Sequence, residues 1–183
     1  MAITDVHVRR IDPKRAYPLT AMALAQKWGK AAGLDPEWVR AHELVESSDR
    51  PLARNERGNA WGMMQVKPAT AETIVAWMRS SGLAKHPKIA KVLRQWRGRP
   101  EDLLNPELNV LLGAAYLRLI KERLGTQDHA TVAAAYNQGP GAVRKALAAQ
   151  VRAGEGGPDL MPEHMTEAMR AYVERIEEAK ERA

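Results

Sequence analysis

The sequence predicts an all-α protein of roughly eight helices. Apolar residues recur three and four positions apart in several segments, which is the spacing of one face of a helix. Proline, aspartate and glycine stand where helices begin and end. No segment alternates apolar and polar residues over the length of a half-buried strand. At 183 residues without cysteine, the chain can bury a core without disulfides, so we expect one domain, residues 18–181, preceded by an extended basic arm, residues 1–17.

The first two helices are bounded by signals at their ends. The first is expected over about residues 18–32, because Gly33 suits the left-handed position after a helix. Asp35 is a suitable N-cap for the second helix, and Pro36 suits its first turn. An apolar stripe carries this second helix to Ser47, where a polar loop begins.

A basic segment follows that loop. One helix is expected over about residues 68–80, and another carries apolar residues at the i, i+3, i+4 and i+7 spacing from Ile89 onward. Residues 79–99 hold seven lysines or arginines and no acid. The cations of this segment either form a solvated face or bind an anion.

The rest of the chain predicts four more helices. They are expected over about residues 106–124, over about 128–136, from the Gly139-Pro140-Gly141 turn to about 151, and over about 162–180. A glycine-rich link at 153–158 separates the last two.

Glu46 is the strongest candidate for chemistry. It lies one residue beyond the apolar stripe of its helix and close to the negative end of the helix dipole. Partial desolvation and the dipole both disfavour the carboxylate, so we expect a raised pKa, as a general acid near neutral pH requires. On this stretch alone, the alternative is an ordinary surface glutamate.

Other kinds of catalytic site have little support. The five histidines are scattered without metal-ligand spacing, so neither a zinc site nor any other metal site is predicted. There is no GxSxG motif and no cysteine nucleophile, and no glycine-rich loop follows a strand. We expect no cofactor, and carboxylate chemistry on a helical scaffold remains.

Three sequence blocks point to a family. In order they are Glu46-Ser47, then Gly62-Met63-Met64-Gln65 with Pro68-Ala69-Thr70-Ala71, then Ala135-Tyr136-Asn137-Gln138-Gly139-Pro140-Gly141. Together they resemble the lysozyme-like lytic transglycosylases of the soluble-transglycosylase type, and the resemblance covers about residues 34–176. It implies a lysozyme-like helical domain that cleaves the β-1,4 bond between N-acetylmuramic acid and N-acetylglucosamine in peptidoglycan, with a 1,6-anhydro product.

The resemblance also implies roles for single residues. Glu46 would act as the catalytic acid and then as the base. The residues implied in substrate binding are Ser47, Met64, Gln65, Tyr136, Asn137 and Tyr172. From the residues alone, Met64 is better explained as a core side chain, and Tyr172 is explained equally well as a core aromatic with a satisfied hydroxyl.

Compared with the family that the chain resembles, residues 72–102 are expected to be an enlarged basic helical insertion, because this stretch is longer than the family's usual connection. The chain also departs from the family pattern at three places. Asp49-Arg50 stands where the family often has Phe-Asn, and Asn55-Glu56 stands where a serine usually touches the acid. Lys67 replaces a residue that tends to be apolar. Asp49 and Glu56 are thus possible second carboxylates, and since standard glycosidases use two, a hydrolytic muramidase like the goose-type lysozymes is the alternative activity.

The net charge of +6 favours an anionic partner, such as the cell wall, a membrane surface or, more weakly, nucleic acid. No apolar run is long enough to cross a bilayer, and the N-terminus lacks the apolar core of a secretion signal. With the implied activity, these features lead us to expect a phage protein, associated with the virion or released at lysis, that acts on the wall and contacts other virion proteins. The alternatives are a bacterial protein exported by a dedicated machine, and an assembly or DNA-contacting component with secondary wall-cutting activity.

Overall fold

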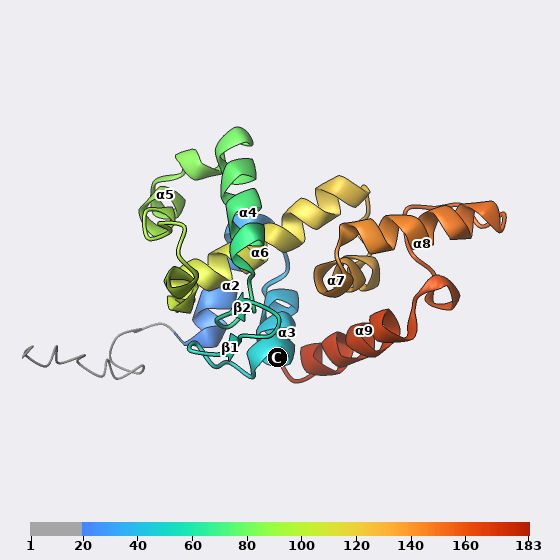
Figure 1. Cartoon of the computed structure of the whole chain (residues 1–183), viewed down its shortest axis with the longest axis horizontal. Helices are drawn as coiled ribbons and strands as arrows, with labels where there is room; N and C mark the ends of the chain where they lie inside the picture. Colours follow the sequence, from blue (N-terminus) through green and yellow to red (C-terminus); the bar gives the residue numbers. More distant parts are fainter. Residues whose placement is uncertain (1–19) are drawn as a thin grey trace, which may run out of the picture.

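The computed structural model describes residues 20–183, so the arm predicted at residues 1–17 lies outside the described residues. Within them the chain forms eight α-helices and one two-stranded ribbon, which confirms the all-α prediction (Figure 1). The helices are α2 (Ala21–Ala32), α3 (Pro36–Ser47), α4 (Pro68–Ser80), α5 (Pro87–Leu93), α6 (Pro106–Leu124), α7 (His129–Gln138), α8 (Pro140–Arg152) and α9 (Glu167–Lys180). Short 3₁₀ turns are η1 (Leu83–Lys85), η2 (Pro100–Leu104) and η3 (Pro162–His164).

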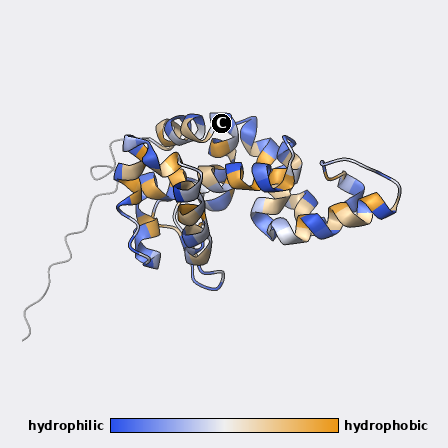
Figure 2. Ribbon diagram, turned by 90° about the horizontal axis from the view of Figure 1, so that it is seen from above, coloured by the Kyte–Doolittle hydropathy of each residue, from blue (hydrophilic) through white to orange (hydrophobic). Residues whose placement is uncertain are grey.

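Helix α6 runs through the middle of the molecule, and α2, α4, α5, α7 and α8 all contact it (Figure 1). Asn105 caps its first turn through a side-chain bond to the N–H of Leu108, and Gly125 ends it in the left-handed conformation. Most of its residues are buried, as a helix with apolar side chains on nearly all sides requires. The surrounding helices mix hydrophobic and hydrophilic residues along their length, so that each packs one face inward (Figure 2).

The basic segment is helical over a shorter stretch than predicted. Ile89, Val92 and Leu93 are buried, but α5 ends at Leu93 because the N–H groups of Gln95 and Trp96 turn back to carbonyls three residues earlier. The seven cations of residues 79–99 are all exposed (Arg79, Lys85, Lys88, Lys91, Arg94, Arg97 and Arg99).

The last helix also differs from the prediction at its start. Residues 162–164 form η3 instead of a first helical turn, and Thr166 then caps α9 by accepting the N–H of Met169. Within residues 20–183, no helix combines the length and the apolar content that crossing a bilayer needs.

The loop between α3 and α4 is anchored on α6 by a buried amide. Its strands β1 (Arg54–Asn55) and β2 (Ala60–Trp61) pair antiparallel. The side chain of Asn109, fully buried, accepts the Met64 N–H at 2.7 Å and donates to the Trp61 and Leu103 carbonyls at 2.7 and 2.9 Å. Gly62 has a φ of +77°, and a Cβ there would lie 2.4 Å from the Asn109 amide nitrogen. Only glycine lets the loop approach α6 this closely.

A charged cluster holds the end of α3. The Arg40 guanidinium binds both carboxylate oxygens of Asp49 and reaches Glu43 at 3.3 Å. Glu43 is not exposed at all, and one of its oxygens has no hydrogen-bond partner in the described part of the chain. Burial raises the pKa of Glu43 to about 8, with a further rise from Asp49, although Arg40 opposes both. The buried carboxyl is therefore neutral at neutral pH.

This buried carboxyl predicts a dependence of stability on pH. The unfolded Glu43 carboxyl ionises near 4.5 and the folded one near 8, so the folded state holds the extra proton between these values. The free energy of unfolding should therefore fall as pH rises from about 4.5 to about 8. Glu43→Met removes the buried polar group and leaves Arg40 paired with Asp49, so we expect it to stabilise the fold by about 1–4 kcal/mol above neutral pH and to flatten that slope.

Denaturant unfolding of the wild type and of Glu43→Met at about pH 5 and about pH 9 measures how the free energy of unfolding depends on pH. Glu72→Met on α4 is the matched control, because Glu72 is exposed, and it should leave the slope as in the wild type. If Glu43→Met unfolded with the wild-type pH dependence, Glu43 would not be the group responsible.

Candidate active site

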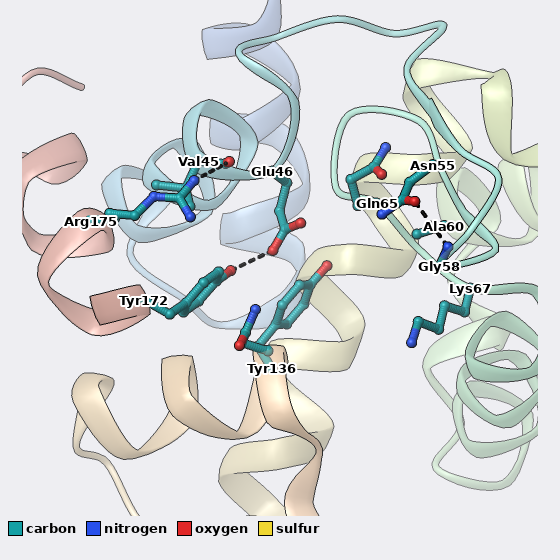
Figure 3. A pocket seen from close by; sticks show the side chains of 11 residues that line it. Val45, Glu46, Asn55, Gly58, Ala60, Gln65, Lys67, Tyr136, Tyr172 and Arg175 are labelled. Atoms are coloured by element: carbon teal, nitrogen blue, oxygen red, sulfur yellow. Dashed lines mark hydrogen bonds between the residues drawn. The ribbon is translucent and has the colours of Figure 1, made fainter. Parts of the chain in front are cut away.

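Glu46 is the next-to-last residue of α3, and its carboxyl group faces a cavity. The helix ends because Ser48 is left-handed, with a φ of +52°. The Tyr172 hydroxyl donates to Glu46 Oε1 at 2.6 Å (Figure 3). Burial raises the pKa of Glu46, while the hydrogen bond from Tyr172 and the positive charge of Arg175 lower it by less. The predicted direction of this pKa shift is thus found, with burial as its main cause.

His42 lies one helical turn before Glu46, and its side chain is only 2% exposed. Its Nδ1 lies 3.1 Å from the Tyr172 hydroxyl. Burial lowers the pKa of His42 to about 3, so the ring is neutral. Because the Tyr172 hydroxyl donates to Glu46, its oxygen accepts the proton on His42 Nδ1. His42, Tyr172 and Glu46 therefore form one hydrogen-bonded chain that ends on the carboxyl group.

Sequence reasoning considered His42 only as a metal ligand and missed this contact. The signal that could have found it is the i, i+4 spacing of His42 and Glu46, which puts both side chains on one face of α3. The third member comes from α9, 126 residues away from Glu46.

Tyr136 and Asn137 lie near the end of α7, as the Gly139-Pro140-Gly141 turn predicts. The Tyr136 hydroxyl donates to the Met64 carbonyl at 2.7 Å. Its ring packs on His42 with a centroid distance of 4.8 Å. Tyr136 thereby joins the loop before α4 to α3, while the Asn137 side chain stays exposed beside it.

A cavity of about 360 Å³ lies over Glu46 (Figure 3). It is lined by Val45, Glu46, Asn55, Gly58, Ala60, Gln65, Lys67, Tyr136, Asn137, Tyr172 and Arg175. A second cavity of about 210 Å³ shares four of these residues, namely Gln65, Lys67, Tyr136 and Asn137. We call the two cavities together the groove, because these four residues line both of them.

The structure brings five of the predicted site residues together along the groove: Glu46, Gln65, Tyr136, Asn137 and Tyr172. Two others lie beneath it. Ser47 is 2% exposed, and its hydroxyl accepts the Arg50 N–H. Met64 is fully buried: its carbonyl accepts the Tyr136 hydroxyl, while its side chain packs against Gly113 of α6.

Neither candidate second carboxylate lines the groove. Asp49 is held by both terminal nitrogens of Arg40. Glu56 is exposed on the loop and is absent from both cavity linings. In the described part of the chain, Glu46 supplies the only carboxyl group of the groove. Among the same residues, no three acidic, histidine or cysteine side chains gather as a metal site would need.

Known proteins with similar structures share this fold. The inactive mutant of the lytic transglycosylase Slt from Pseudomonas aeruginosa is 25% identical, with a TM-score of 0.66 over 91% of this chain and 24% of that one. The 70 kDa soluble lytic transglycosylase from Escherichia coli is 24% identical, with a TM-score of 0.69 over the same shares. The second likeness concerns the fold alone.

Similar sequences include the endo-type membrane-bound lytic murein transglycosylase A of Klebsiella pneumoniae and that of Salmonella paratyphi B. Each is 34% identical over 102 residues, which is 55% of this chain and 42% of the relative. The chain thus matches less than half the length of these curated relatives. The family model described as "Transglycosylase SLT domain" matches residues 23–155, which include Glu46 and the groove residues of α7. Since this match spans well over half of the chain, the protein belongs to the transglycosylase SLT domain family.

Proposed function

We propose that the protein is a lytic transglycosylase that cleaves the β-1,4 bond between N-acetylmuramic acid and N-acetylglucosamine in peptidoglycan, with Glu46 as its acid and base. One observation carries the proposal: among residues 20–183, the groove holds a single carboxyl group, partly buried and with a raised pKa. A standard glycosidase needs a second carboxyl group as nucleophile or base. A single one suffices where the sugar itself completes the displacement.

In the first step the proton of Glu46 goes to the glycosidic oxygen. The C1–O bond of the muramic acid residue breaks, and the electron pair stays with the leaving N-acetylglucosamine oxygen. Since the Tyr172 hydroxyl occupies Oε1, the proton that is transferred sits on Oε2. Burial raises the pKa of Tyr172 well above its usual value, so its hydroxyl stays protonated and remains a donor.

In the second step the substrate replaces the missing nucleophile. The N-acetyl carbonyl of the muramic acid residue stabilises the positive charge at C1. The 6-hydroxyl of the same residue then attacks C1. Glu46, now a carboxylate, accepts the hydroxyl proton and returns to its starting state. The exposed amide of Asn137 lines the groove, and we assign it the binding of the sugar's polar groups.

The alternatives from the sequence differ in support. The pairing of Asp49 with Arg40 and the position of Glu56 outside the groove disfavour a two-carboxylate hydrolase. Association with a phage virion stays a prediction, and so do contacts with virion proteins or nucleic acid. Purified particles that contain the protein would confirm the virion association, and its absence from them would contradict it.

Glu46→Gln tests the proposed acid. An amide cannot donate the proton, so we expect the rate of wall cleavage to fall by about 100-fold or more while the fold is retained. The falling turbidity of a peptidoglycan suspension measures the rate of cleavage, and circular dichroism measures whether the fold is retained. Glu56→Gln is the matched control on the same side of the molecule, and it should cleave as the wild type does.

Mass spectrometry of the digested wall tests the outcome of the reaction. Products with 1,6-anhydro ends, each lighter by one water than a hydrolysis product, are expected. Reducing ends alone, or loss of cleavage in Glu56→Gln, would instead establish a hydrolase that uses a second carboxyl group.

Tyr172→Phe tests the hydrogen-bonded chain through its effect on pH. The acid must be protonated to act, so kcat/KM should fall as pH rises through the pKa of Glu46. Since the Tyr172 hydrogen bond lowers that pKa, its removal should move the falling limb to higher pH. His42→Phe leaves the Tyr172 hydroxyl in place and takes away one neutral hydrogen bond, so we expect a smaller shift and a drop in kcat of about threefold to tenfold.

The pH–rate profiles of the wild type, Tyr172→Phe and His42→Phe measure these shifts. Tyr116→Phe is the control, because Tyr116 packs on Tyr136 and forms no hydrogen bond with Glu46. A profile of Tyr172→Phe that coincided with the wild type would show that Tyr172 does not set the proton affinity of Glu46.

A further inference from the structure

More cations than acids line the groove in the described part of the chain. Glu46 is its only carboxyl group in the described part of the chain, whereas Lys67 and Arg175 both line it. Arg175 donates to the Val45 carbonyl at 3.1 Å and lies close enough to Glu46 to lower its pKa. Lys67 has no ion pair and no side-chain hydrogen bond within residues 20–183. Within residues 20–183, Lys67 is thus a groove cation whose side chain has no polar partner from the protein, whereas Arg175 is held by a carbonyl.

The local backbone adds to this positive charge. Lys67 is the N-cap residue of α4, a helix of 13 residues, and no side chain caps that end. The first N–H groups of the helix and the positive end of its dipole therefore lie beside Lys67. Lys67 and Thr70, one turn into the helix, both line the second cavity. Figure 3 shows the Lys67 side chain extending toward the side of the cavity that holds Tyr136.

An amine in this position suits one feature of the proposed substrate. The sugars of a peptidoglycan strand are alike except that muramic acid carries a lactyl group on O3. That group ends either in a free carboxylate or in a peptide stem, which has carboxylates of its own. N-acetylglucosamine has only neutral groups. A carboxylate is therefore the charged group that distinguishes the two sugars, and a charge-assisted hydrogen bond is the strongest contact that a lysine can offer it.

We propose that Lys67 is a specificity-determining residue, which binds a carboxylate on the O3 substituent of muramic acid and thereby favours muramic acid strands over neutral aminosugar chains. The inference rests on the proposed function, because it assigns a part of the same substrate to the same groove. It assigns Lys67 no part in proton transfer, so binding and cleavage can be tested apart.

Binding to the inactive Glu46→Gln protein tests the proposal without turnover. Calorimetry would compare three glycans of equal length: a peptide-free muramic acid strand, a strand with peptide stems, and a chitin oligosaccharide. Lys67→Met in this background should weaken binding to at least one muramic acid strand by about tenfold and leave chitin binding unchanged. Lys67→Arg, which keeps the charge, should restore most of the affinity. High salt should shrink the difference between Lys67 and its Met variant.

The two muramic acid strands identify the source of the carboxylate. A loss confined to the peptide-free strand supports the lactyl carboxylate, and a loss confined to the other supports the peptide stem. Lys91→Met on α5 is the matched control for the loss of one exposed lysine, and it should bind all three glycans as before.

An equal loss on chitin, or no loss on either muramic acid strand, would overturn the role of Lys67 while the proposed function stood. If the Glu46→Gln protein bound none of the three glycans, the proposed function itself would fail.

Discussion

The site depends on the hydrogen bond between Tyr172 of α9 and Glu46 of α3, at 2.6 Å. This bond requires α9 to pack on α3, and that packing covers the end of α3. Without it, Glu46 would be a hydrated side chain at a helix terminus, with an ordinary pKa. With it, burial raises the pKa and the phenol limits the rise. The proton affinity of the acid is therefore set by a balance between desolvation, which raises it, and the Tyr172 hydroxyl and the Arg175 charge, which lower it.

The floor of the site is aromatic and uncharged. His42 is neutral because it is buried, and it packs between the rings of Tyr136 and Tyr172. A charged imidazole there would favour the carboxylate form of Glu46 and so weaken it as an acid. The neutral ring can instead orient the Tyr172 hydroxyl through Nδ1. A buried histidine thus supports acid catalysis here by staying uncharged.

Helix α3 carries two buried or partly buried carboxyl groups one turn apart, and their surroundings separate their roles. Glu43 is enclosed with Arg40 and Asp49, away from the groove. Glu46 faces the groove and meets no other carboxyl group there. Besides contacting Glu43, Arg40 binds both carboxylate oxygens of Asp49 and so holds that acid away from the groove. In the part of the chain that the structure describes, one acid and two cations line the groove, a balance suited to an anionic glycan.

The sequence by itself determined the helices and the family. Helix α6 was predicted at its observed bounds because Asn105, Pro106 and Gly125 act on their own neighbours. The raised pKa of Glu46 was also predicted from its place on α3. Helix α5 was predicted too long because the apolar spacing continues to Trp96 beyond the last helical hydrogen bond. Capping residues and apolar spacing act over one or two helical turns. The positions of the helices and the surroundings of Glu46 at the end of α3 depend on signals of that range.

Only the tertiary structure decided which motif residues face the groove. Met64 turns into the core against Gly113, while its neighbour Gln65 lines the groove. The pairing of Asp49, the contact of His42 with Tyr172, and the lack of a polar partner for Lys67 among residues 20–183 were likewise not foreseen from the sequence. Each depends on side chains that helix packing brings together or leaves apart, and the direction of a side chain in a folded loop follows from those long-range contacts, not from its neighbours in the chain.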